Sequence, residues 1–186
     1  MVHYHYWRWD RALSEDVCDF IMSQLDWGSA EEGTVGTQKG DLSLEEIRRS
    51  EVIWQDSLSA IGCISTAYIH AANRFSGWNF ELSYLEPVQL TKYDSARQGH
   101  YDWHRDSAAP NADQELRKLS FVALLSDSSE FEGGEFEINE ASLDKNILNN
   151  RGDVVVFPSY LNHRVSPVTS GVRHSAVAWM IGPQFK

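Results

Sequence analysis

Histidines are the residues best suited to chemistry in this chain, and one of the seven, His104, stands two positions before Asp106. His104 and Asp106 fall in a segment expected to be extended. Residues i and i+2 of an extended segment project to the same side, so this imidazole and carboxylate can converge on one ion. Such a pair is common by chance and carries little weight alone. For His3, His5 and His70, a structural or solvent-facing role is the better interpretation.

A second histidine and an arginine strengthen the prediction that His104 and Asp106 are metal ligands. His163 follows an apolar strand expected at 154–157, and Arg173 stands at the start of the last expected strand. Two histidines and one carboxylate leave three open positions on an octahedral ion, a geometry that suits non-haem Fe(II). The planar fork of Arg173 can hold the far end of a dicarboxylate whose near end chelates the metal. Ser175 shares the face of Arg173 and can add a hydroxyl to the same carboxylate.

Two competing chemistries are poorly supported. His100 and His104 are spaced like the pair of a zinc protease helix, but the glutamate that should follow the first histidine is absent. A serine hydrolase would need a Gly-x-Ser-x-Gly elbow, which the sequence lacks.

The spacing of apolar residues predicts helices in the first part of the chain and strands in the second. Ser14 resembles an N-cap before Val17, Ile21 and Leu25, and Gly28 is expected to end that helix. A second helix is expected from near Asp56 to just before Gly77. It carries apolar side chains at Leu58, Ile61, Ile64, Tyr68 and Ala72.

After Gly77, short β-rich segments alternate with turn residues. These segments cover 80–84, 88–93, 119–125, 135–138, 154–157 and 175–180. The pattern predicts a mainly β fold, a sandwich or jelly roll backed by two to three N-terminal helices. We expect a single domain over 1–186, with a helical layer at about 11–76 and a β core at about 80–183.

Composition narrows the function classes. The net charge is −11, and no basic stripe marks a nucleic-acid binder. The nearest candidate, Arg48-Arg49, is expected to be a solvated helix end among glutamates. Cys18 and Cys63 are expected to be buried, reduced thiols. The first residues contain no apolar signal region and no run has membrane-spanning length, so a cytoplasmic protein without nucleic-acid or membrane partners is expected.

Several motifs occur together in one order along the chain. They are Tyr93, the run 99–106 (GHYDWHRD), the run 118–120 (KLS), the run 131–138 (FEGGEFEI), the run 152–158 (GDVVVFP) and the run 163–173 (HRVSPVTSGVR). As a set they resemble the prolyl 4-hydroxylase-like branch of the Fe(II)/2-oxoglutarate oxygenases, most closely the bacterial PKHD-type hydroxylases. The resemblance covers about Phe80 to Pro183, and more faintly Ile47 to Trp54.

This resemblance implies a double-stranded β-helix of the cupin-like kind whose open end holds iron. By position, His104, Asp106 and His163 match the metal ligands, and Arg173 matches the 2-oxoglutarate anchor. Tyr93 matches a tyrosine that hydrogen-bonds the co-substrate, although a core tyrosine is an equal alternative. Animal oxygen-sensing relatives place a tyrosine where this chain has Leu124. The second contact to the far carboxylate must therefore come from elsewhere, and Ser175 is the candidate.

The expected reaction is Fe(II)-, 2-oxoglutarate- and O₂-dependent hydroxylation of a C–H bond, with ascorbate as an optional reductant. A prolyl residue in a peptide or protein is the first candidate substrate. A free amino acid or small metabolite, or a metal- and 2-oxoglutarate-binding sensor without turnover, are the alternatives. Specificity is expected in the helical layer and in the segments 28–40 and 108–115. The second of these segments is either a lid or an ordinary surface connection.

Overall fold

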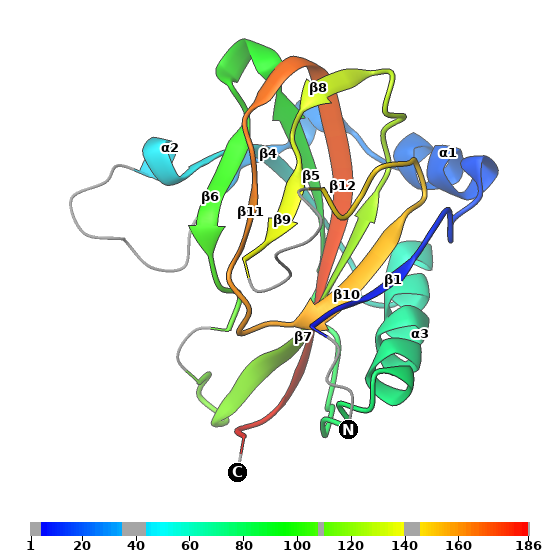
Figure 1. The fold of residues 1–186 in the computed structure, drawn as a ribbon, viewed down its shortest axis with the longest axis vertical. Helices are drawn as coiled ribbons and strands as arrows, with labels where there is room; N and C mark the ends of the chain where they lie inside the picture. The colour runs from blue at the N-terminus through cyan, green and yellow to red at the C-terminus, as the bar shows by residue number, and fades with distance from the viewer. Residues whose placement is uncertain (1–4, 35–43, 108–109, 140–145, 186) are drawn as a thin grey trace.

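The chain folds into two antiparallel sheets, with helices against the outer face of the larger one (Figure 1). The computed structural model describes residues 5–34, 44–107, 110–139 and 146–185. The large sheet has the order β1 (Trp7–Trp9), β10 (Val154–Pro158), β7 (Glu115–Leu124), β12 (Val168–Pro183), β5 (Val88–Asp94), β4 (Glu51–Gln55) and β2 (Glu31–Glu32), with β8 (Phe131–Gly133) also paired to β12. The small sheet has the order β3 (Arg48–Arg49), β6 (His100–His104), β11 (His163–Val165) and β9 (Phe136–Ile138).

Two longer helices, α1 (Glu15–Ser23) and α3 (Ala60–Phe75), lie on the same side of the molecule (Figure 1). Ser14 caps α1 as predicted, since its side chain accepts from the N–H of Val17. The helix ends at Ser23 and not at Gly28, which lies in the short 3₁₀ turn η1 (Trp27–Ser29). One-turn elements α2 (Leu44–Ile47) and η2 (Ser95–Arg97) complete the helical content of the described residues.

The predicted start of the second long helix was too early. Ser59 is its N-cap and accepts from the N–H of Gly62, whereas Asp56 accepts from the N–H of Leu58 in the turn before the helix. Leu58 therefore lies outside the helix and is exposed. Cys63 is also exposed, contrary to expectation, because it lies two residues beyond the inward-facing Ile61 and so on the opposite side of α3.

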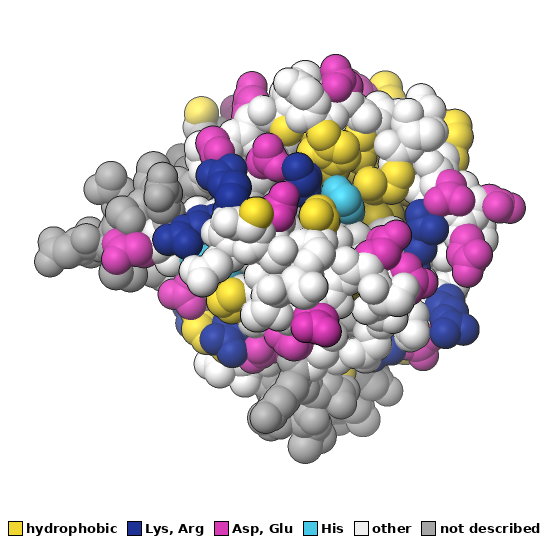
Figure 2. Space-filling model, turned by 90° about the horizontal axis from the view of Figure 1, so that it is seen from above, with side chains coloured by type: hydrophobic (Ala, Val, Ile, Leu, Met, Phe, Trp, Pro, Cys, Tyr) yellow, Lys and Arg dark blue, Asp and Glu magenta, His cyan; other side chains and the backbone are white. Residues whose placement is uncertain are grey.

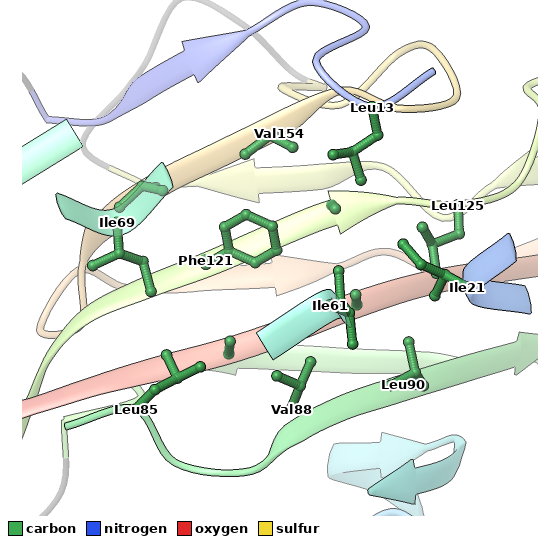
Figure 3. Close-up of a cluster of buried hydrophobic side chains, with 14 of the residues drawn as sticks. Leu13, Ile21, Ile61, Ile69, Leu85, Val88, Leu90, Phe121, Leu125 and Val154 are labelled. Atoms are coloured by element: carbon green, nitrogen blue, oxygen red, sulfur yellow. The ribbon is translucent and has the colours of Figure 1, made fainter. Parts of the chain in front are cut away.

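Alternation along the central strands builds the core between the large sheet and the helices. Figure 3 shows Ile61 and Ile69 of α3 beside strand residues such as Phe121. The buried members of this core come from both helices, from β5, β7, β10 and β12, and from positions just outside these elements: Leu13, Cys18, Ile21, Ile61, Ile69, Ala72, Leu85, Val88, Leu90, Leu119, Phe121, Ala123, Leu125, Val154, Val156, Ala176, Ala178 and Met180.

The opposite face of the large sheet meets the small sheet in a second core. Its large-sheet members include Val122, Leu124, Val155 and Phe157, each one position away from a residue of the first core. Polar side chains share this inner face at positions that the alternation predicts, among them Ser120, Arg173 and Ser175, which are all buried. The space between the two sheets is therefore where buried chemistry is concentrated.

Three further sequence expectations needed correction at the level of the fold. Phe80–Tyr84 forms no strand; the nearby Leu85 makes only an isolated bridge to Met180. Arg48 lies in β3 and is buried, so it is not a solvated helix end. The region 11–76, expected to be helical, also contributes β2, β3 and β4, and β1 precedes it. None of the helices in the described ranges is both long and apolar enough to cross a membrane.

Candidate metal centre and co-substrate cleft

The three predicted ligands come together at the facing ends of two paired strands. His104 ends β6 and is the ladder partner of His163, which begins β11. Asp106 follows β6 by two residues, with its carboxylate oxygens 3.6 Å from His104 Nε2 and 3.4 Å from His163 Nε2. One donor atom from each residue lies within 4.8 Å of the others. Within the described residues, this is the one group of at least three His, Cys, Asp or Glu side chains that could hold a metal ion.

Backbone carbonyls orient both imidazoles. The Nδ1 atom of His104 lies 2.8 Å from the carbonyl oxygen of Asp102, and that of His163 lies 3.0 Å from the carbonyl oxygen of Leu161. A carbonyl oxygen can only accept, so each Nδ1 donates and each Nε2 keeps its lone pair for the site. Burial, reinforced by the neighbouring His163, lowers the pKa of His104, which keeps that imidazole neutral.

Hydrogen bonds also fix the carboxylate. Ser120 Oγ donates to Asp106 Oδ2 at 2.7 Å, and the N–H of Asp106 donates to the carbonyl of Ser159. Burial alone would raise the pKa of Asp106, but the two histidines and the Ser120 hydroxyl outweigh it and hold that pKa below its usual range. The site thus presents one carboxylate and two imidazole donors, the set that suits a divalent ion with open positions.

Arg173 lies deeper in the same cleft, 1% exposed and without a carboxylate partner in any ion pair of the described residues. Its Nη1 donates to Ser175 Oγ at 3.2 Å, while Nε and Nη2 have no hydrogen-bond partner among the described residues. Burial lowers its pKa to about 10, so the guanidinium stays charged at neutral pH. A buried cation with free N–H donors is costly unless an anion completes it.

Aromatic side chains close the cleft around these groups. Tyr93 is buried, and the Arg173 guanidinium carbon lies over its ring, 5.7 Å from the ring centroid. Tyr101 stacks on His104 with ring centroids 3.4 Å apart, and Arg48 lies over the ring of Tyr101. The cavity is lined by Gln89, Tyr93, Tyr101, His104, Asp106, Val122, Phe136, His163, Val165, Arg173, Ser175, Val177 and Trp179.

All six residues singled out in the sequence line this one cavity. Tyr93 belongs both to the inner core and to the cavity wall, so its two interpretations are not exclusive. Leu124 lies opposite Ser175 in the β7–β12 ladder, and Ser175 is the side chain that bonds to Arg173. The segments 28–40 and 108–115, where specificity was expected, include positions 35–40 and 108–109 that lie outside the described residues.

Several residues of the site were missed by sequence reasoning. Ser120 was part of a motif but had no assigned role, and the alternation with Val122 and Leu124 would have placed it on the inner face. Ser159, Tyr101 and Trp179 carry no comparable local signal, because their roles depend on contacts between distant strands.

A family model describing the 2OG-Fe(II) oxygenase superfamily matches residues 88–181. The chain therefore belongs to this superfamily, whose members use Fe(II), 2-oxoglutarate and O₂. A PKHD-type hydroxylase of Idiomarina loihiensis is 36% identical over 101 residues, which cover 53% of this chain and 45% of that protein. A PKHD-type hydroxylase of a Synechococcus species is 32% identical over 117 residues, 60% of this chain and 52% of that protein. The chain spans about half the length of these curated relatives.

Solved structures with the same fold include prolyl hydroxylases. The viral collagen prolyl hydroxylase of Paramecium Bursaria Chlorella virus-1 superposes with a TM-score of 0.68 at 18% identity, covering 96% of this chain and 97% of that one. The Pseudomonas putida prolyl-4-hydroxylase gives a TM-score of 0.68 at 19% identity, with 98% and 94% covered. These likenesses confirm the jelly-roll fold that the sequence predicted.

The residues present fit the groups that the superfamily uses. The donor set of one carboxylate and two imidazoles suits Fe(II). The unpartnered Nε and Nη2 of Arg173 suit the far carboxylate of 2-oxoglutarate, because both are buried donors inside the same cavity as the ligands. The candidate metal ligands and the candidate co-substrate anchor thus line one cavity.

Proposed function

We propose that this chain is an Fe(II)- and 2-oxoglutarate-dependent dioxygenase that hydroxylates a prolyl residue in a peptide or protein. The observation that carries the proposal is the shared cavity, in which His104, Asp106 and His163 lie beside a buried arginine with free donors. His104 and His163 would hold the metal through Nε2, and Asp106 through a carboxylate oxygen. Arg173 would hold the far carboxylate of 2-oxoglutarate, with Ser175 and Tyr93 beside it.

When bound, Fe(II) with O₂ and 2-oxoglutarate supplies oxidation of a substrate C–H bond to an alcohol, with succinate and CO₂ as co-products. The chain's own task is to orient these groups and exclude water. The Nδ1 hydrogen bonds hold both imidazoles before any ion arrives, and the apolar wall formed by Val122, Phe136 and Val177 keeps the cavity dry.

Two observations support a prolyl substrate in particular. The cavity wall carries the aromatic side chains Tyr101, Phe136 and Trp179, which suit a compact apolar ring. A structure with the same fold is described as a Trichoplax adhaerens prolyl hydroxylase in complex with a peptide fragment of hypoxia inducible factor; its TM-score is 0.65 at 18% identity, over 95% of this chain and 83% of that one.

Surface charge bears on the partner as well. On the face shown in Figure 2, basic side chains are separated by acidic ones and form no continuous stripe. With a net charge of −11, a peptide or small-molecule partner is favoured over a nucleic acid. The cytoplasmic location and the use of ascorbate stay predictions from the sequence.

The test is to incubate the purified chain with Fe(II), 2-oxoglutarate and O₂, with proline-containing peptides or with free proline and other metabolites. Succinate formation should depend on the peptide, and mass spectrometry should place one added oxygen atom on a prolyl residue. Replacing His104 by Ala should abolish both signals, because a two-ligand site holds Fe(II) poorly.

Turnover with a free amino acid alone would move the substrate class from peptides to metabolites. Bound metal and 2-oxoglutarate without any succinate would favour a sensor. Wild-type activity in the His104→Ala protein would overturn the ligand assignment itself.

A further inference from the structure

Two serine hydroxyls form a chain of hydrogen bonds that ends on the carboxylate ligand. Ser120 Oγ lies 2.7 Å from Asp106 Oδ2, and Ser159 Oγ lies 2.9 Å from Ser120 Oγ. Both serines have no exposed surface, and Asp106 is 8% exposed. They come from neighbouring strands of the large sheet: Ser120 is in β7, and Ser159 directly follows β10, whose Phe157 is the ladder partner of Ser120.

The number of hydrogens available fixes which serine donates in these two hydrogen bonds. An ionised carboxylate only accepts, so the single hydroxyl hydrogen of Ser120 must go to Asp106. Ser120 can then only accept from Ser159, which makes Ser159 the donor. Successive hydroxyl donors polarise one another in a buried setting, so the Ser159 hydroxyl strengthens the bond that Ser120 makes.

The backbone fixes the same region independently of these hydroxyls. The N–H groups of Asp106 and Ser107 both donate to the carbonyl of Ser159, and the N–H of Ser159 donates to the carbonyl of Lys118. Substituting either serine by alanine leaves these bonds intact and removes only the hydroxyl. The side-chain contribution can therefore be separated from the backbone frame.

Resting on the metal site proposed above, we propose that Ser120 and Ser159 are positioning residues that make Asp106 a one-oxygen metal ligand. Ser120 donates to Oδ2, the oxygen 3.4 Å from His163 Nε2, whereas Oδ1, 3.6 Å from His104 Nε2, accepts no hydrogen bond among the described residues and is the oxygen left for the ion. A carboxylate that used both oxygens would fill one further position on an octahedral ion and leave two open instead of three. The serine pair thus preserves the open positions that co-substrate and O₂ need.

The experiment measures Mn(II) affinity, by loss of the free-ion electron paramagnetic resonance signal, in the absence of 2-oxoglutarate. Manganese is a hard ion that reports on the oxygen ligand without turnover. Ser120→Ala should weaken Mn(II) binding by about 10- to 100-fold, the usual effect of removing a partner of a metal ligand. Ser159→Ala should weaken it by about threefold, because that hydroxyl acts only through Ser120.

The double substitution is the sharper measurement. Because Ser159 acts through Ser120, the Ser120→Ala/Ser159→Ala protein should bind Mn(II) as Ser120→Ala alone does, a non-additive result. Ser120→Thr keeps the hydroxyl and should restore most of the affinity. Ser65→Ala is the matched control, since Ser65 is equally buried but bonds to the carbonyl of Ile61 inside α3.

Wild-type Mn(II) affinity in folded Ser120→Ala protein would overturn the proposal, and additive losses would overturn the relay between the serines. If Ser120→Ala did not fold, Ser120→Cys, with nearly the same volume and a weaker donor, should show the same loss. Failure of the underlying site is distinguished by His104→Ala. Wild-type Mn(II) binding in that protein would reject the ligand set, whereas its loss, with Ser120→Ala unchanged, would reject the serine pair alone.

Discussion

The two faces of the large sheet differ in what their buried residues do. Toward α1 and α3, the strands present an apolar layer that includes Phe121, Ala176 and Met180. Toward the small sheet, the same strands present buried polar groups one position away, among them Ser120, Arg173 and Ser175. Burying polar groups costs free energy, so a fold keeps them where they bind something. Both faces carry an apolar core, but these buried polar groups lie on the inner face.

The inner face is itself divided. The three candidate metal ligands each have a hydrogen-bonded side-chain atom, His104 and His163 at Nδ1 and Asp106 at Oδ2, which holds them in place without a metal ion. Arg173 instead keeps two buried donor atoms without a partner. The first arrangement is complete without a ligand, and the second is completed only by an anion.

The largest expected effect is on the helix-facing side. Phe121→Ala should reduce the free energy of unfolding by about 3–5 kcal/mol, because it empties a fully buried position beside Tyr68 of α3. Urea denaturation measures this loss. At temperatures where the variant is folded, 2-oxoglutarate affinity should be close to wild type; a selective loss of co-substrate binding would contradict the division between the faces.

The inner face should respond in the opposite way to Arg173→Met. Binding of 2-oxoglutarate to the Mn(II)-loaded protein should weaken by about 2–5 kcal/mol, the usual cost of breaking a buried arginine–carboxylate pair. Stability without ligand should be unchanged or higher by about 1 kcal/mol, since an uncompensated buried charge is removed. Fluorescence titration and urea denaturation give the two numbers. Arg151→Met, which breaks an ion pair with Asp19 far from the site, is the control.

The sequence predicted which strand residues face the cleft better than it predicted contacts between distant strands. The inner and outer registers of β7 and β12 are set by period-2 alternation, and His104, Asp106, His163, Arg173 and Ser175 occupy the predicted side of the cleft. Local signals also placed the Ser14 cap. Arg48 could not be predicted, because its burial depends on pairing between β3 and β6, which are far apart in sequence. Cys63 was misplaced because apolar composition, unlike angular position on α3, does not distinguish faces.

The stability of the folded chain is expected to depend on pH through His174, which neighbours Arg173 in β12. Burial, with the positive charges of Lys92 and Arg173, lowers its pKa to about 4, while an unfolded histidine titrates near 6.5. The unfolded state therefore binds the extra proton first, so stability is full above about pH 6.5 and is lost as pH falls toward 4. At pH 5 this one group should cost about 2 kcal/mol. His174→Gln should lose less stability by about that amount between pH 7 and 5 in urea titrations, and parallel pH profiles for the two proteins would refute the assignment.

The smallest expected effect comes from adding a methyl group at Gly134, whose backbone packs against the Arg173 side chain. Gly134 has a φ of +65°, and a Cβ there would lie 2.8 Å from Arg173 Cδ and 3.0 Å from Val168 Cγ2. Gly134→Ala should therefore displace the guanidinium and weaken 2-oxoglutarate binding by about tenfold, or about 1.4 kcal/mol. Gly77→Ala is a matched control, because Gly77 has a similar φ of +75° but nothing within 4 Å of the added Cβ. Both variants should lose stability through the left-handed backbone, by about 1 kcal/mol. Only Gly134→Ala should lose co-substrate affinity. An equal loss of affinity in both variants would mean that Gly134 is needed for its backbone conformation and not for the position of Arg173.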